Sequence, residues 1–267
     1  MPKKVAIAIG AHPDDIEFYM AGTLVLLKKA GYETHYLTVA NGSCGSVEYS
    51  VTATKAIRNT EAREAAKLLG ATFHPSLVDD LEVVYSVGLL RSVAAVIREV
   101  KPSIVLTHSP QDYMEDHMTT SRLAVSAAFV RGMPNFRTTP SREPGDYDVT
   151  VYHAMPHGLR DGLRRRLIPG AFVDTTSVQK VKRDALAAHK SQQGWLDVSQ
   201  GLSSFLLAME SMSLELGNMS KRFKCAEGWR RHLHLGLGTP DGDPLREALG
   251  RHYLVNKTYE QNLEKGI

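Results

Sequence analysis

An alternation of short apolar segments with helix-like segments constrains the fold of this chain more than any other feature. Four apolar segments predict buried strands of a sheet: residues 5–9 (VAIAI), 35–40, 71–74 and 103–107 (SIVLT). The segments between them predict helices at residues 13–31, 55–69 and 87–100. Strands that alternate with helices in this way predict an α/β fold of three layers, in which helices cover both faces of a mostly parallel sheet.

The alternating pattern becomes weaker after Pro134. Residues 149–153 predict a further strand, and residues 178–189 and 202–219 predict helices. Because α/β domains commonly reach this length, the 267 residues predict a single domain, with a core of about residues 1–193 and a C-terminal extension of about 194–267. The stretch HLHLGLG (232–238) is interpreted as surface or packing residues.

Composition argues against several classes of protein. The net charge is only +3 and the arginines at 164–166 have no aromatic residues among them, so we expect no nucleic-acid binding and interpret these arginines as a solvated helix face. Cys44 and Cys225 lie far apart, which predicts no disulfide framework and fits a reducing compartment. No segment approaches the roughly 20 apolar residues of a membrane span, so we expect a cytoplasmic protein.

Two polar clusters follow predicted strands and suggest a metal site. In GAHPDDIE (10–17), His12 and Asp15 are three residues apart, which places both side chains on one side of a helical turn. His117, in THSPQDYMEDH (107–117), follows another buried strand, and the carboxyl ends of parallel strands meet at one edge of a sheet. Two imidazoles and one carboxylate are typical of a catalytic zinc site, although other divalent metals also fit. Simple stabilisation of a helix start by acidic residues remains the alternative.

Asp14 is the candidate general base beside this metal site. It lies on a different side of the turn from Asp15 and can take a proton from zinc-bound water, whose pKa zinc lowers to about 7. This arrangement suits the hydrolysis of an amide.

Several segments together resemble one known family. AHPDDIE (11–17) resembles the signature of the PIG-L or LmbE-like zinc-dependent N-deacetylases, which act mainly on N-acetylglucosamine-type groups. The resemblance extends over residues 5–192 and includes five further matches: Ala21-Gly22-Thr23, Asn41-Gly42 with Gly45, RNTEAREAAKLLG (58–70), THSPQDYMEDH, and ALAAHKSQ (185–192). It implies a Rossmann-like fold, a homo-oligomer and an N-acetylated sugar derivative as the substrate.

The resemblance also implies roles for individual residues. It assigns zinc binding to His12, Asp15 and His117, and the general base to Asp14. Further residues keep two interpretations each. Asp116, a catalytic candidate, orients a neighbouring histidine or the base, or caps a helix. The substrate-binding candidates are Arg58, His108, His157 and His189. Arg58 could instead be a helix-surface charge, and His189 could support the site from behind or be a buried structural residue.

One position departs from the family pattern. Many members have HPDH where this chain has Met114-Glu115-Asp116-His117, and the first histidine of that motif is associated with oxyanion stabilisation. Methionine cannot donate a hydrogen bond, so another donor takes this role or the chemistry is altered or lost. The candidate donors are His108, His153 and His157. Met114 also suggests a more apolar substrate pocket.

The sequence therefore predicts a metal-dependent hydrolase that removes an acetyl group from the amide of a small sugar-like metabolite. Two alternatives remain: a hydrolase of a non-sugar amide, and a metal- or ligand-binding protein without turnover. Dinucleotide binding is disfavoured because GAHPDD lacks the GxGxxG pattern and has carboxylates in its place.

Overall fold

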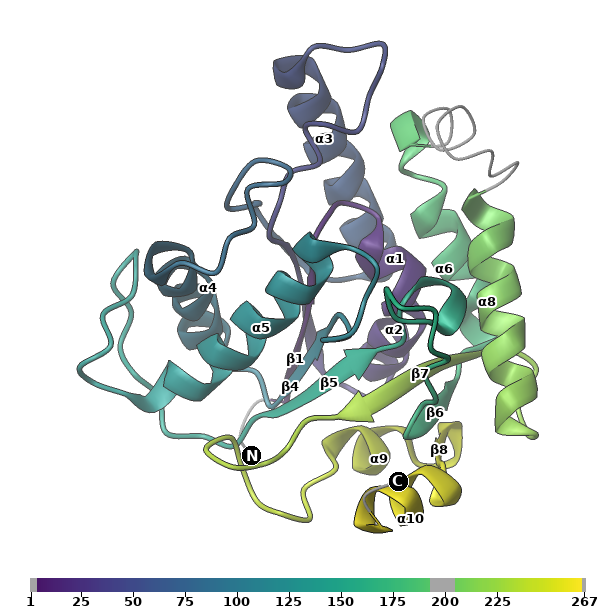
Figure 1. Cartoon of the computed structure of the whole chain (residues 1–267). Helices are drawn as coiled ribbons and strands as arrows, with labels where there is room; N and C mark the ends of the chain where they lie inside the picture. Colours follow the sequence, from purple (N-terminus) through teal and green to yellow (C-terminus); the bar gives the residue numbers. More distant parts are fainter. Residues whose placement is uncertain (1–3, 193–204, 266–267) are drawn as a thin grey trace.

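The computed structural model describes residues 4–192 and 205–265, and Figure 1 shows that one twisted sheet runs through this part of the chain. The sheet has eight strands in the order β3-β2-β1-β4-β5-β7-β6-β8. The strands are β1 (Val5–Gly10), β2 (Glu33–Thr38), β3 (Thr72–His74), β4 (Ile104–Thr107), β5 (Thr150–Ala154), β6 (Ala171–Asp174), β7 (Ala226–Arg231) and β8 (Tyr253–Val255).

The first five strands form the parallel half of the sheet. β1 pairs with β2 and β4, β2 with β3, and β4 with β5, all in parallel. Every residue of β1 is buried, as expected of a strand that is covered on both faces. The predicted α/β fold with a mostly parallel sheet is therefore confirmed for these strands.

The last three strands form an antiparallel half that the sequence pattern does not predict. β7 pairs antiparallel with both β5 and β6, and β6 pairs antiparallel with β8. Because β7 lies between β5 and β6, the sheet continues through the part of the chain that we expected to be an extension (Figure 1). The division into a core and an extension stays a prediction.

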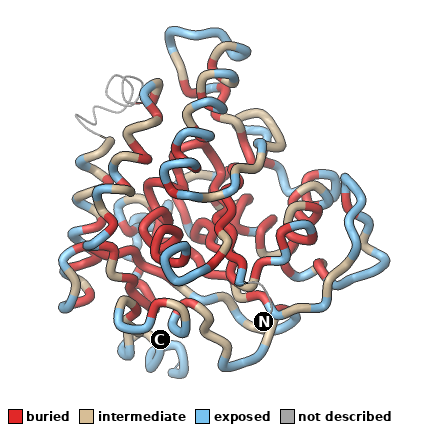
Figure 2. The backbone as a smooth tube through the Cα atoms, turned by 180° about the vertical axis from the view of Figure 1, so that it is seen from behind, coloured by how far each residue is buried: buried red, intermediate tan, exposed pale blue. Residues whose placement is uncertain are grey.

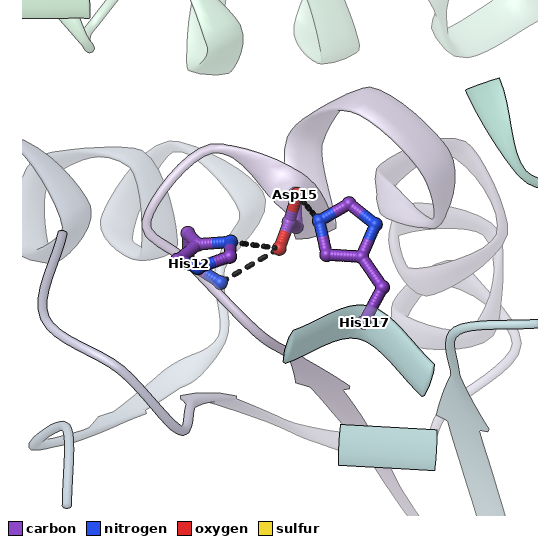
Figure 3. A group of neighbouring side chains, drawn as sticks. All are labelled: His12, Asp15 and His117. Atoms are coloured by element: carbon purple, nitrogen blue, oxygen red, sulfur yellow. Dashed lines mark hydrogen bonds and ion pairs between the residues drawn. The ribbon is translucent and has the colours of Figure 1, made fainter. Parts of the chain in front are cut away.

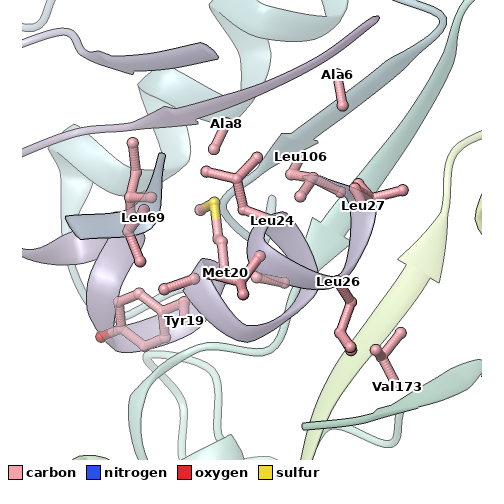
Figure 4. Packing of buried hydrophobic residues seen from close by; sticks show 14 of the residues in the cluster. Ala6, Ala8, Tyr19, Met20, Leu24, Leu26, Leu27, Leu69, Leu106 and Val173 are labelled. Carbon is pink, nitrogen blue, oxygen red and sulfur yellow. The ribbon is translucent and has the colours of Figure 1, made fainter. Parts of the chain in front are cut away.

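Helices cover both faces of the parallel half. They are α1 (Asp15–Tyr19), α2 (Ala21–Lys29), α3 (Val51–Leu69), α4 (Val87–Val100) and α5 (Glu115–Phe129). α6 (Gln179–Leu186) packs against α1 and α3, α8 (Phe205–Ser220) packs against β6 and β7, α9 (Pro244–Leu249) packs against β8, and α10 (Lys257–Lys265) follows β8. Residues that alternate along β1 face two separate apolar cores. Ala6 and Ala8 pack against α1 and α2, whereas Ile7 and Ile9 pack with α4 and α5. Figure 2 shows the buried centre, and Figure 4 shows α2 residues packed on β1 and β4.

The prediction of one helix at residues 13–31 is wrong in one respect, because the structure has two helices there, α1 and α2. Asp14 has a left-handed φ of 107°, so the helix begins at Asp15, and Met20 leaves the helical region at φ −131°. The second helix has its own anchor: the N–H groups of Gly22 and Thr23 each donate to the carboxylate of Glu227 in β7, both at 2.8 Å. A Cβ at position 22 would overlap Thr175, so only glycine allows this approach.

Other predictions differ from the structure at their boundaries. The second strand begins two residues earlier than expected, and α3 begins at Val51, where Ser50 accepts the N–H of Ala53. The helix expected at 178–189 is the shorter α6, and the one expected at 202–219 is α8, with residues 202–204 outside the described part. Over the described ranges, no helix is both long and apolar enough to cross a membrane.

The arginines at 164–166 do not form a helix face, so that interpretation is wrong. They belong to a short hairpin between β5 and β6, because the N–H of Asp161 donates to the carbonyl of Arg165 and Arg160 forms a bridge with Arg166. The polar loop residues Asp161 and Gly162 favour this turn over a helix.

Candidate active site

Three predicted metal ligands meet at the carboxyl ends of β1 and β4. His12 follows β1, Asp15 begins α1, and His117 lies in the first turn of α5. Nδ1 of His12 is 3.4 Å from Asp15 Oδ2, and Nε2 of His117 is 3.3 Å from Asp15 Oδ1 (Figure 3). One ligand atom from each residue lies within 4.8 Å of the others. Two neighbouring parallel strands thus bring together side chains that are a hundred residues apart.

Carboxylates hold the outer nitrogen of each histidine. Nε2 of His12 is 3.0 Å from Asp116 Oδ2 and 3.1 Å from Asp80 Oδ1. Nδ1 of His117 is 3.2 Å from Asp112 Oδ1. These contacts orient the rings so that the opposite nitrogens face Asp15, which is the usual support of metal-binding histidines. No side chain caps α5, so Asp116 is placed to orient His12.

The surroundings of the three residues fit a divalent cation. Five buried carboxylates lie around them, Asp14, Asp15, Glu17, Asp112 and Asp116, and of these five Asp14 alone pairs with a guanidinium group of the described residues, that of Arg58. Such an excess of buried negative charge is costly without a cation. Two overlapping groups, formed by His108, Asp112 and His117 and by His12, Asp80 and Asp116, have similar spacing. A cavity of about 410 Å³ borders these groups, and among the three groups only that of His12, Asp15 and His117 has all its members on the cavity wall.

The pKa values of these residues reflect their mutual contacts. Burial lowers the pKa of His12, but contacts with Asp116, Asp15 and Asp80 raise it more, and it lies well above 6.5. Burial also lowers the pKa of His117, yet Asp15 and Asp112 raise it to about 9. Burial raises the pKa of Asp15, but His117 and His108 lower it well below its usual range. The site therefore favours positive charge facing Asp15.

Asp14 lies beside the metal-ligand candidates and is held by Arg58. Its Oδ2 accepts a hydrogen bond of 3.0 Å from Nη2 of Arg58, which also donates to the carbonyl of Pro13; Nη1 of Arg58 donates to that of Gly42. Burial raises the pKa of Asp14 to about 6, although Arg58 lowers it in part. Arg58 is 3% exposed, so its interpretation as a helix-surface charge is wrong.

The cavity of about 410 Å³ opens onto this site. The metal-ligand candidates and Asp14 form one part of its wall. Aromatic side chains form another part, and these are Phe18, Tyr19, Tyr113 and Phe205. Met114, the residue at the departing family position, also lines the cavity. The cavity can hold a small ligand with an apolar face next to a polar reacting group.

Comparison with known proteins places this chain in a family. The family model of PIG-L, GlcNAc-PI de-N-acetylase, matches residues 7–128, which include the whole candidate metal site. A diacetylchitobiose deacetylase from Thermococcus kodakarensis is 30% identical over 196 residues, covering 71% of this chain and 70% of that protein. The chain belongs to the PIG-L family.

The chain is also similar to a hydratase and to a deacetylase of known structure. A 4-oxalmesaconate hydratase from Pseudomonas putida is 29% identical over 203 residues, covering 72% of this PIG-L family chain and 75% of that enzyme. The solved structure of N,N'-diacetylchitobiose deacetylase from Pyrococcus horikoshii has the same fold, with a TM-score of 0.73 at 24% identity, covering 88% of this chain and 85% of that one. The family thus contains both deacetylases and a hydratase.

The structure separates the candidate histidines of this PIG-L family chain. His157, after β5, lines the cavity, and its ring lies 5.5 Å from that of Phe18. His108 lies behind the metal site instead: its Nε2 is 3.1 Å from Asp15, and its ring stacks on His117 at 4.1 Å. His153 is tied to the carbonyl of His108 at 2.8 Å, so it does not face the cavity.

His189 is fully buried and also lies away from the cavity wall. Its Nε2 is 3.5 Å from Glu17 Oε2, and the hydroxyl of Tyr36 donates to the same oxygen at 3.3 Å. Burial lowers the pKa of His189, but Glu17 raises it more. A direct substrate contact of His189 does not follow from this position.

Sequence reasoning missed several residues of the site. Asp112 was visible within THSPQDYMEDH, but only the fold shows that it contacts His117. Asp80 comes from a loop without a recognisable motif, and nothing in its local sequence indicates a contact with His12. Arg160 and Arg164 line the cavity through a hairpin whose turn could not be recognised from composition.

Proposed function

We propose that this protein is a metal-dependent N-deacetylase that hydrolyses the amide of an N-acetylated, sugar-like small molecule. The observation that carries the proposal is the group of His12, Asp15 and His117 on the cavity wall, with Asp14 next to it. The sugar-like substrate is supported by the diacetylchitobiose deacetylase relative.

His12, Asp15 and His117 would hold the cation, with Asp116 and Asp112 orienting the two imidazoles. Zinc suits two imidazoles and one carboxylate, and other divalent metals also bind such ligands. When bound, the cation lowers the pKa of water and polarises the amide carbonyl.

Asp14 would act first as the general base and then as the general acid. Its carboxylate takes a proton from the attacking water while the water oxygen forms a bond to the amide carbon. When the C–N bond breaks, Asp14 returns that proton to the leaving nitrogen, so acetate and a free amine are the products. Arg58 keeps Asp14 in place through its hydrogen bond of 3.0 Å.

His157 would supply the hydrogen bond that Met114 cannot donate. Among the candidate histidines it alone lines the cavity, and its ring nitrogens have no hydrogen-bond partner in the described part of the chain. Burial lowers the pKa of His157, so its imidazole is neutral at neutral pH and still has one N–H to donate. This N–H would stabilise the oxyanion that forms on the amide carbonyl.

The test is to measure metal content and turnover of N-acetylglucosamine derivatives on the same samples. We expect near one zinc per chain and release of acetate in the wild type, and loss of both in His117→Ala. His252→Ala is the matched control, because His252 lies near Asp174 and away from the cavity. Wild-type protein that cannot be loaded with any divalent metal would refute the proposal.

A hydratase activity is a second candidate, because a hydratase of the family is 29% identical to this chain. Adding water to a carbon–carbon double bond would need a base that takes one proton from water and an acid that gives a proton to the neighbouring carbon, and no amide bond breaks. Turnover of an unsaturated dicarboxylate with no release of acetate from any amide would favour this candidate. The cytoplasmic location, the homo-oligomer and the absence of nucleic-acid binding stay predictions.

A further inference from the structure

The hairpin of residues 159–167 between β5 and β6 places two arginines at the cavity. Its ends are joined because the N–H of Leu167 donates to the carbonyl of Leu159 at 2.8 Å. Its turn is fixed by Asp161, whose Oδ1 accepts the N–H groups of Leu163 and Arg165 at 2.9 and 2.8 Å. Arg160 and Arg164 both line the cavity from this hairpin.

The two arginines have no carboxylate partner in the described ranges 4–192 and 205–265. Arg58, the third arginine on the cavity wall, pairs with Asp14, and Arg166 of the same hairpin pairs with Glu215 at 2.6 Å. The one hydrogen bond found for these two guanidinium groups joins Nη1 of Arg160 to the carbonyl of Arg164, at 2.9 Å. Within the described residues, the other donors of these two guanidinium groups are therefore available to a ligand.

Charge is distributed unevenly over the cavity wall. The carboxylates of Asp14 and Asp15 lie at the metal site, whereas Arg160 and Arg164 lie on the hairpin, with aromatic side chains forming other parts of the wall. Asp161 is the one acid on the hairpin, and its Oδ1 is already engaged by the backbone. A ligand with an anionic group is attracted to the two guanidinium groups of the hairpin, so this group is held at the hairpin side of the cavity.

We infer that the substrate carries an anionic group, a phosphate or a carboxylate, that binds Arg160 and Arg164 while its N-acyl amide reaches the metal site. Guanidinium groups bind both oxyanions well because their parallel N–H groups match two oxygens. A neutral sugar gains much less from two cations. This inference rests on the proposed amide hydrolysis and adds the chemical class of the substrate.

The experiment compares three N-acetylated probes on the metal-loaded protein. N-acetylglucosamine 6-phosphate carries a phosphate, N-acetylmuramic acid carries a carboxylate, and N-acetylglucosamine is neutral. Binding of the corresponding free amines is measured by calorimetry alongside turnover, because these products bind without reacting. We expect the wild type to favour one of the anionic probes, which identifies the anion, over the neutral one.

The decisive protein is the double variant Arg160→Gln/Arg164→Gln. We expect it to raise Kd and KM for the preferred anionic probe about 10-fold, because two exposed charge contacts are lost, and to leave the Kd of the neutral amine nearly unchanged. Arg165→Gln is the matched control, because Arg165 lies on the same hairpin but does not line the cavity. Arg160→Lys with Arg164→Lys keeps both charges and should restore much of the affinity.

The outcomes separate this inference from the proposed function. Equal binding of neutral and anionic amines, or an equal loss in Arg165→Gln, would overturn the role of the two arginines while leaving the deacetylase proposal intact. Arginine-dependent binding of an anionic amine, without hydrolysis of any probe, would instead reject the deacetylase proposal and keep the anion site.

Discussion

The two halves of the sheet differ in what they contribute. In the parallel half, β1 and β4 end at the cavity and present His12, Asp15 and His117 together. In the antiparallel half, β7 supplies Glu227, which anchors the start of α2 and forms a buried ion pair of 2.6 Å with Lys182. One half therefore carries the proposed reacting groups, and the other fixes their support. Changes in the first should impair chemistry, and changes in the second should impair stability.

The largest expected effect comes from Asp14→Asn in the parallel half. The amide cannot take a proton from water, so kcat should fall by about 100- to 10,000-fold while the metal stays bound. Metal analysis and single-turnover rates on the same sample check this. His12→Ala is the contrast, because it should lose metal and turnover together. Near wild-type kcat in Asp14→Asn would remove Asp14 as the base.

Lys182→Met should have the opposite profile, because it acts in the antiparallel half. It leaves the carboxylate of Glu227 buried without its cation, which should lower the free energy of unfolding by about 3–5 kcal/mol. Urea denaturation of the metal-loaded protein measures this, and kcat below the transition should stay near that of the wild type. Lys180→Met is the control, since Lys180 forms an exposed pair with Asp184 and should cost less than about 1 kcal/mol. A loss of activity without a loss of stability would contradict the division between the two halves.

His157→Ala changes a residue that follows β5, the strand at which the parallel half joins the antiparallel half. Removing an oxyanion donor should lower kcat about 100- to 1000-fold with little change in KM. Adding Met114→His to this variant should recover part of kcat, since position 114 lines the same cavity. An unchanged kcat in His157→Ala would show that another group binds the oxyanion.

The smallest effect is expected for Asp112→Asn. Asparagine keeps an oxygen for the N–H groups of Tyr113 and Met114 but loses the charge that supports His117. Metal affinity should weaken about 10- to 100-fold, measured by competition with a chelator. Asp146→Asn changes an exposed carboxylate outside the cavity wall and should leave metal affinity unchanged.

The difference between the two halves of the sheet also explains which strands the sequence predicts. The strands of the parallel half are apolar because both faces are buried, so β1 and β4 were visible, and strand ends then brought His12 and His117 together. β6 and β8 have only four and three residues, and β7 contains a buried charge, Glu227, which pairs with Lys182 of α6. The residue types in such strands depend on partners elsewhere in the chain, so local hydrophobic periodicity does not predict these strands.

The break between α1 and α2 was invisible for a related reason. Residues 15–29 have helical composition throughout, and the second helix start is determined by Glu227, about two hundred residues later. Likewise, the surface interpretation of Arg164 followed from composition, whereas its place at the cavity depends on the hairpin turn at Asp161. Contacts between distant segments decide both features.

The position of β7 between β5 and β6 also dictates an order of assembly during synthesis. Chains leave the ribosome from the N-terminus, so β6 emerges before β7, the strand that joins it to the rest of the sheet. Until β7 is complete, β5 is an open edge that can pair with other chains, and the hairpin between β5 and β6 is tethered at only one end. In a nascent chain, the strands that carry the proposed metal ligands can therefore pair before the proposed anion site is anchored at both ends.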